Sequence, residues 1–206
     1  MRKITCLCEQ TFNADLPETV NIDENPELVT DIQQGVFLTC ICPSCNADVR
    51  TELKTRINWP SKNVSIVLLP ETDRFSFLSG KISPEQPDDE IVIGYPEMAD
   101  RVAVYSASLE PMAVEAVKVH LATKAKESAP DADITIMFES LRDNKDLEFH
   151  IHGLKSGEVA VTLVPFNVYE TILNEIHDNP ASSYNELKNG QYVSVNNILI
   201  EGGQDD

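Results

Sequence analysis

Five cysteines are the side chains best suited to chemistry in this chain of 206 residues, and all of them lie within the first 45. They form two groups, one with Cys6 and Cys8 and one with Cys40, Cys42 and Cys45. Four thiolates form the closed tetrahedral set that holds a structural zinc ion. An odd number of cysteines, with no apolar export signal at the start of the chain, argues against a disulfide framework. The spacing therefore predicts a metal site.

Two pairs of these cysteines have the better chelating geometry. Alternate residues of a strand point to the same face, so we expect Cys6 and Cys8 to point together. Cys42 and Cys45 have the two-residue spacing, with a proline between them, that lets a turn direct two sulfurs at one ion. Cys40 would share a strand face with Cys42 and could substitute as a ligand, but we favour a small buried side chain. We predict structural Zn²⁺ bound by Cys6, Cys8, Cys42 and Cys45.

The Cys-Pro-Ser-Cys segment at residues 42–45 could instead be a redox dithiol. Such dithiols lie at the start of a helix, where the helix N-terminus lowers the thiol pKa. Here apolar and β-branched residues alternate with charged ones after the second cysteine, which predicts one long strand over Arg50–Ile57. We therefore favour the metal site over redox catalysis.

Residues 1–83 have the pattern of a small β domain. A helix is expected to begin near Asn25, which could cap it, and to end at Gly35. This helix would be an insertion between the two metal turns of a zinc-ribbon-like domain. The expected strands are Ile4–Cys8, Thr11–Asn13, Val36–Cys40, Arg50–Ile57 and Val64–Leu69.

The rest of the chain has the pattern of an acidic α+β domain over residues 91–200, joined by a proline-rich acidic linker at residues 84–90. Its centre is an antiparallel meander, and a capping box formed by Asn167 and Glu170 opens the helix after it. Residues 201–206 are expected to be a mobile tail. The fold class is therefore α+β. The expected elements are strand Glu90–Gly94, helices Pro96–Ser106 and Glu110–Lys126, meander strands Asp133–Glu139, Leu147–Gly153 and Val159–Val164, and a last strand Tyr192–Ile200.

The net charge of −18 falls mostly after residue 83 and argues against nucleic-acid and anionic membrane partners. Arg50, Lys54 and Arg56 would share a strand face close to Trp59, an arrangement that can grip phosphates and stack a base. Glu52 interrupts that row, so we favour a solvated face. No apolar run is long enough to span a membrane, and a cytoplasmic protein is expected.

Two histidines could form a second metal site. His150 and His152 would share one face of a meander strand, and His120 or His177 would have to supply a third ligand. We favour a solvated sheet face for this pair. Glu139 and Glu148 lie on facing strands, but in so acidic a chain paired carboxylates are expected by chance. The sequence contains no recognisable catalytic arrangement.

Several of these features resemble the CpXC domain family of bacterial and archaeal proteins. They are the N-terminal cysteine pair, the run from Asn25-Pro26-Glu27-Leu28 to Gly35, the hydrophobic strand before Cys42-Pro43-Ser44-Cys45, and the strand-rich stretch that ends in the helical region Glu110–Lys126. The resemblance covers residues 1 to about 125. The first pair departs from it, since the family has two residues between these cysteines. The resemblance implies a metal-binding module and no reaction.

These observations together predict a non-enzymatic zinc-binding protein that acts as an adaptor for another protein, which it would meet through a basic surface of that partner. The alternatives are a zinc-ribbon regulator that binds nucleic acid and an enzyme with an unrecognised site.

Overall fold

The structure is a computed structural model that describes residues 1–201. The chain divides into two compact units, Met1–Ala99 and Asp100–Asp206, and the division falls within helix α3 (Tyr95–Ser106). The described residues form several sheets and six α-helices, which confirms the α+β fold class. That residues 1–83 and 91–200 fold separately stays a prediction. Of the predicted tail, residues 202–206 lie outside the described part.

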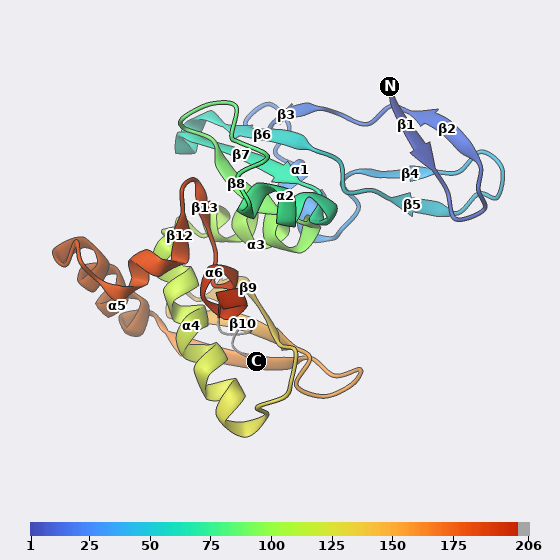
Figure 1. Ribbon diagram of the computed structural model, residues 1–206. Helices are drawn as coiled ribbons and strands as arrows, with labels where there is room; N and C mark the ends of the chain where they lie inside the picture. Colours follow the sequence, from blue (N-terminus) through green and yellow to red (C-terminus); the bar gives the residue numbers. More distant parts are fainter. Residues whose placement is uncertain (202–206) are drawn as a thin grey trace. The chain divides into compact units, whose positions relative to one another are not determined.

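Two short antiparallel hairpins carry the cysteines of the first unit (Figure 1). Strand β1 (Arg2–Thr5) pairs with β2 (Thr11–Ala14), and β4 (Thr39–Ile41) pairs with β5 (Asp48–Arg50). Each cysteine pair begins at the residue after β1 or β4 ends, so both pairs lie in hairpin turns. The predicted strand over Val36–Cys40 starts too early, because the positive φ of Leu38 (59°) turns the chain just before β4.

A larger sheet lies beside these hairpins in the first unit. The strands of this sheet that belong to the first unit lie in the order β3-β6-β7-β8, and they are β3 (Thr19–Asn21), β6 (Thr55–Trp59), β7 (Val64–Leu69) and β8 (Glu90–Ile93). Strands β6 and β7 are antiparallel, whereas β3–β6 and β7–β8 are parallel. Short 3₁₀ turns, η1 (Pro60–Lys62) and η2 (Glu71–Asp73), follow β6 and β7. The predicted bounds of β7 are confirmed.

The single long strand predicted over Arg50–Ile57 is wrong. Arg50 pairs with Thr39 in one sheet, whereas Thr55 pairs with Leu68 in another, so the chain changes sheets between them. Glu52 secures this crossing, because its carboxylate accepts hydrogen bonds from backbone N–H groups of η2 and α3 at 3.1 and 3.0 Å. A period-two pattern cannot show that a strand has two successive partners.

Helices α1 (Leu28–Gln33) and α2 (Arg74–Leu78) complete the first unit. The predicted end of α1 is confirmed: Gly35 has a φ of 73° and donates its N–H to the carbonyl of Ile32 at 3.1 Å. The predicted cap is wrong, since no side chain caps α1 and the amide of Asn25 donates to the carbonyl of Asn21 at 3.3 Å.

The second unit is built on the predicted meander. Strand β10 (Asp146–His152) pairs antiparallel with β9 (Thr135–Arg142) on one side and β11 (Ala160–Pro165) on the other. Helices α4 (Pro111–Ser128) and α5 (Phe166–Asp178) pack against it around one apolar core. Phe138 and Phe149 meet edge to face in that core, with ring centroids 5.6 Å apart.

Two predictions for the end of this unit are wrong. Helix α5 begins at Phe166, so Asn167 is already inside the helix and no capping box forms. The strand predicted over Tyr192–Ile200 is only β13 (Tyr192–Val193), which pairs with β12 (Lys188–Asn189) after the 3₁₀ turn η3 (Ser183–Leu187). The hydroxyl of Ser194 accepts the N–H of Asn196 at 3.2 Å, and helix α6 (Asn196–Glu201) begins there.

Candidate metal centre

The turn between β1 and β2 holds Cys6 and Cys8. The carbonyl of Cys6 accepts the N–H of Glu9, and the N–H of Cys6 donates to the carbonyl of Gln10, both at 2.9 Å. Glu9, the residue after the second cysteine, has a φ of 67°. This left-handed residue turns the chain back toward β2 directly after the thiol pair.

The turn between β4 and β5 repeats this arrangement with one residue more. The carbonyl of Cys42 accepts the N–H of Asn46, and the N–H of Cys42 donates to the carbonyl of Ala47, again both at 2.9 Å. Asn46 follows Cys45 and has a φ of 58°. The short spacing of the first pair is therefore the same kind of turn shortened by one residue, which explains how Cys-x-Cys can direct two sulfurs to one point.

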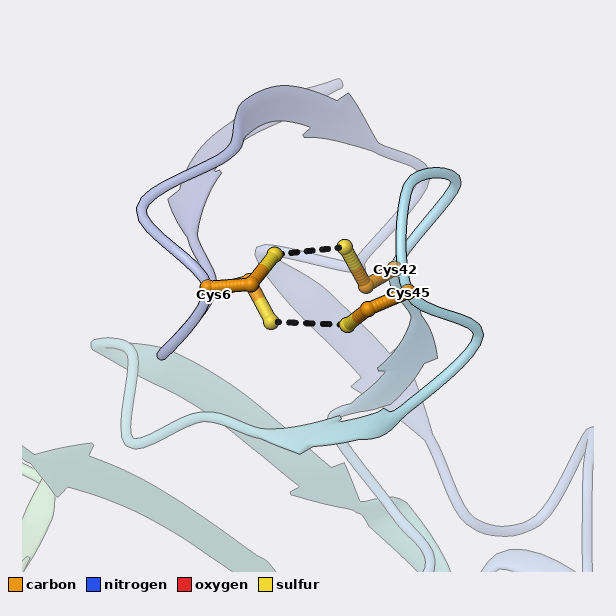
Figure 2. Close-up of side chains that lie close together, drawn as sticks. Cys6, Cys42 and Cys45 are labelled. Carbon is orange, nitrogen blue, oxygen red and sulfur yellow. Dashed lines mark hydrogen bonds between the residues drawn. The ribbon is translucent and has the colours of Figure 1, made fainter.

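The four sulfur atoms of these turns lie within 4.8 Å of one another. Two contacts run between the turns: Cys6 Sγ lies 3.6 Å from Cys45 Sγ, and Cys8 Sγ lies 3.7 Å from Cys42 Sγ. Figure 2 shows Cys6 facing Cys42 and Cys45. Four sulfurs at about 2.3 Å from a zinc ion would be separated by about 3.8 Å. The observed arrangement is therefore close to that of a tetrahedral tetrathiolate site.

The thiols differ in burial and in acidity. Cys6 and Cys42 are buried, whereas Cys8 and Cys45 are exposed. Backbone N–H groups of Cys45 and Ser44 point at the sulfur of Cys42 and lower the pKa of its thiol to about 6. The N–H of Ala47 favours the thiolate of Cys45, but hydrogen bonding with the thiols of Cys8, Cys42 and Cys6 outweighs it and raises the pKa of Cys45 to about 12. A divalent cation would allow all four sulfurs to be thiolates at once.

The fifth cysteine is not a member of the four-sulfur group. Cys40 is partly buried, and its sulfur lies 3.8 Å from the carbonyl oxygen of Val49, across the β4–β5 pair. Burial is the main cause that raises the pKa of the Cys40 thiol. The structure thus separates Cys40 from the cluster that its neighbour Cys42 joins.

The histidines are not gathered into a second cluster. His150 contacts the carboxylates of Glu148 at 3.3 Å and Glu139 at 3.7 Å, while His152 is exposed. The two possible third ligands bond elsewhere, His120 to Tyr184 at 2.7 Å and His177 to Glu110 at 2.9 Å. Within residues 1–201 the four cysteines are the only group of three or more side chains whose ligand atoms converge.

The cations near β6 are paired with carboxylates. Arg56 binds the buried Asp89, and Lys54 lies 2.5 Å from Glu85. Trp59 is buried, so its ring is not available to stack on a base.

In the described part of the chain, no helix is both long and apolar enough to cross a membrane.

Two left-handed residues complete the turns, and neither was predicted from the sequence. Asn46 carries a recognisable signal, because Asn often adopts positive φ. Glu9 carries none, since glutamate has no preference for that conformation, and only its place directly after a cysteine pair indicates its role.

Two hairpin turns that bring paired cysteines to one four-sulfur cluster place this chain in the class of tetracysteine β modules, in which four close cysteines indicate metal binding. The family model described as CpXC protein matches residues 4–118, and the chain belongs to this family. It is 33% identical over 222 residues to an uncharacterized protein of Treponema pallidum (strain Nichols), covering 98% of this chain and 100% of that protein. No solved structure matches. The resemblance seen in the sequence is confirmed.

Proposed function

We propose that this protein is a zinc-binding adaptor in which Cys6, Cys8, Cys42 and Cys45 hold one structural Zn²⁺. The observation that carries the proposal is the convergence of four sulfurs from two turns, with 3.6 and 3.7 Å between sulfurs of opposite turns. Zinc and iron both accept four sulfurs in a tetrahedral arrangement. We assign zinc because two Cys pairs on hairpin turns are the ligand set of zinc ribbons.

The role of the ion would be structural. All four coordination positions would be filled by protein sulfur, which leaves no place for water or substrate. Strands β4 and β5 have three residues each, and isolated two-stranded hairpins are at best marginally stable in water. A shared ion would join the β1–β2 and β4–β5 hairpins, and its binding free energy would stabilise their folded state.

The adaptor role is supported by apolar side chains beside the ligands. Leu7, between Cys6 and Cys8, is fully exposed, and Ile41, directly before Cys42, is 65% exposed. Exposed apolar side chains that form one patch mark protein-interaction sites, and Leu7 and Ile41 would form such a patch on the metal turns. The net charge of −18 favours a partner with a basic surface.

Elemental analysis combined with thiol titration tests the metal. Protein purified without added metal should contain about one equivalent of zinc, and a single thiol, Cys40, should react before chelation and five after it. An iron tetrathiolate absorbs visible light, so a colourless protein would indicate zinc rather than iron. Metal-free protein with five reactive thiols and folded β1–β2 and β4–β5 hairpins would contradict the proposal.

Affinity capture from cell extract, followed by mass spectrometry, tests the adaptor role. The double variant Leu7→Ser/Ile41→Ser should keep its zinc but lose the proteins that the unaltered chain captures. Phe75→Ser is the matched control, because Phe75 is 73% exposed in the same unit but is not next to a cysteine. An identical set of captured proteins for all three chains would contradict a partner surface on the metal turns.

A further inference from the structure

The first unit contains a cavity of about 290 Å³ between β1, β3 and β6. None of the residues that line it is a cysteine. Three cations, Arg2, Lys54 and Arg56, line it together with Glu85. The remaining lining residues are Glu18, Thr19 and Val67. Small-molecule sites begin at about 300 Å³, so the cavity has the size of a small ligand site.

The charge of Arg2 is not balanced by an acid. Its guanidinium donates to the carbonyl oxygens of Pro17 at 3.0 Å and Lys54 at 2.9 Å, and to the hydroxyl of Thr55 at 3.2 Å. These oxygens are neutral, and no carboxylate of residues 1–201 forms an ion pair with Arg2. The contacts fix the guanidinium at the cavity wall while its positive charge remains available.

Glu85 compensates the other two cations from the cavity rim. Its carboxylate lies 2.5 Å from Lys54 Nζ and 3.4 Å from Arg56 Nη2, yet its side chain is 59% exposed. Exposed ion pairs of this kind contribute little to stability. Glu85 therefore occupies the place of an anion without being held firmly there.

The segment that carries Glu85 is anchored elsewhere. Asp89 is 2% exposed, binds Arg56, and accepts hydrogen bonds from the Ser65 hydroxyl and the Gln86 N–H, both at 3.1 Å. On the other side of Glu85, Ile82 and Pro84 lie with Phe77 around a small apolar cavity. The contacts on both sides of Glu85 therefore hold the segment independently of the Glu85 side chain.

We propose that this cavity is a binding site for a small ligand with a phosphate or carboxylate group, and that Glu85 occupies the site in place of the ligand's anionic group. Arg2 and Lys54 bind the entering oxyanion directly, and Arg56, fixed by Asp89, adds its positive charge. Once Glu85 has left, the three cations face Glu18 in the lining and the buried Asp89 behind Arg56, so the site keeps one net positive charge. This site is independent of the proposed zinc centre.

The test is a calorimetric titration of the full, metal-loaded chain with inorganic phosphate and, separately, with malonate. The variant Glu85→Gln removes the competing charge and should bind at least one of the two probes about tenfold more tightly than the unaltered chain. Glu71→Gln is the matched control, because Glu71 is 56% exposed and is also paired with an arginine. It should leave the affinity unchanged.

Two further variants, made in the Glu85→Gln background, test which side chains bind the probe. Both Lys54→Gln and Arg2→Gln should abolish binding of the probe, and Lys54→Gln keeps the test decisive if Arg2→Gln fails to fold. Preference for phosphate or for malonate tells which group the ligand carries. Equal affinities for the unaltered chain and Glu85→Gln, or tight binding that persists in Lys54→Gln, would overturn the proposal. Binding of an oligonucleotide alone, with neither probe bound, would also overturn it.

Discussion

Glu9 and Asn46 occupy the same position in two different turns. Each follows the second cysteine of its pair, each has a positive φ (67° and 58°), and each donates its N–H to the carbonyl of the first cysteine at 2.9 Å. The two metal turns are thus two versions of one backbone design, with spacings that differ by one residue. This equivalence explains why a Cys-x-Cys pair can act together with a Cys-x-x-Cys pair.

Replacing Glu9 by glycine should stabilise the metal-loaded protein. A left-handed conformation costs a residue with a Cβ about 1–2 kcal/mol, and glycine avoids that cost. We expect Glu9→Gly to raise the free energy of unfolding by about 1 kcal/mol and Asn46→Gly by less, because Asn tolerates positive φ. Denaturant unfolding measures both. Lys3→Gly, at an exposed position of β1, is the control and should lower stability; a loss of stability in Glu9→Gly as well would contradict the role of the turn.

Cys40 in β4 and Cys42 in the turn after it should respond differently to substitution. Cys42→Ser removes a buried ligand from the centre of the cluster, so the variant should lose the metal and unfold more readily. Cys40→Ser alters a partly buried thiol outside the cluster and should keep the metal content of the unaltered chain. Elemental analysis and thermal unfolding of the two variants check this. Loss of metal in Cys40→Ser together with retention in Cys42→Ser would mean that the ligand set is different.

Lys118 is the centre of a buried ionic network in the second unit. Its ammonium group lies 2.7 Å from carboxylate oxygens of both Asp100 and Glu115, and all three side chains are almost fully buried. The second carboxylate oxygen of Glu115 accepts the N–H of Val195 at 2.8 Å. Burial alone would lower the pKa of Lys118, but Asp100 and Glu115 outweigh it and raise that pKa.

Replacing this lysine should be strongly destabilising. Lys118→Met would leave two carboxylates buried without their shared cation, and such a loss costs about 3–5 kcal/mol. Lys124→Met, at an exposed position of the same helix, is the matched control and should change stability little. Chemical unfolding that places both variants at the same midpoint would contradict the role of the network.

Arg142 should make stability depend on pH through Glu148. The guanidinium of Arg142 binds the Glu148 carboxylate and is the main cause that lowers its pKa from 4.5 to about 2. A lowered pKa in the folded state stabilises the protein above pH 4.5, and this stabilisation is lost as the pH falls toward 2. Arg142→Met should therefore be less stable than the unaltered chain at neutral pH, and the difference should shrink over that range.

Unfolding free energies measured from neutral to acid pH test this expectation, and an NMR titration of the Glu148 carboxyl should show its pKa rising in Arg142→Met. Lys155→Met is the control, because Lys155 forms only an exposed pair with Glu158 at 3.6 Å. A stability difference for Arg142→Met that stays constant between pH 4.5 and 2 would contradict the assignment of Glu148 as the titrating group.

Local patterns predicted the elements whose partners are close in sequence. Strand β7 is a short, mostly apolar run that pairs with the neighbouring β6. The three meander strands follow one another with short turns, so in both cases the local pattern and the pairing agree. The cysteine quartet could be inferred because ligand type and spacing are themselves the signal. Gly35 ended α1 as expected, since glycine accepts the left-handed φ that this position requires.

The errors arose where distant contacts override a local pattern. The alternation over Arg50–Ile57 is real, but Arg50 and Thr55 pair in different sheets, and Glu52 holds the chain between them by accepting backbone N–H groups from Glu71 and Tyr95. Ser194 ends β13 early because its hydroxyl accepts the N–H of Asn196. These contacts involve residues far apart in the sequence or side-chain hydrogen bonds, and a local hydrophobic pattern indicates neither.

X-ray absorption spectroscopy at the metal edge of the purified protein tests the central claim most directly. We predict absorption at the zinc edge and a first shell of four sulfur atoms at about 2.3 Å, with the shell reduced or lost in Cys42→Ser. A first shell that contains nitrogen or oxygen, or fewer than four sulfurs, would contradict a site formed by Cys6, Cys8, Cys42 and Cys45.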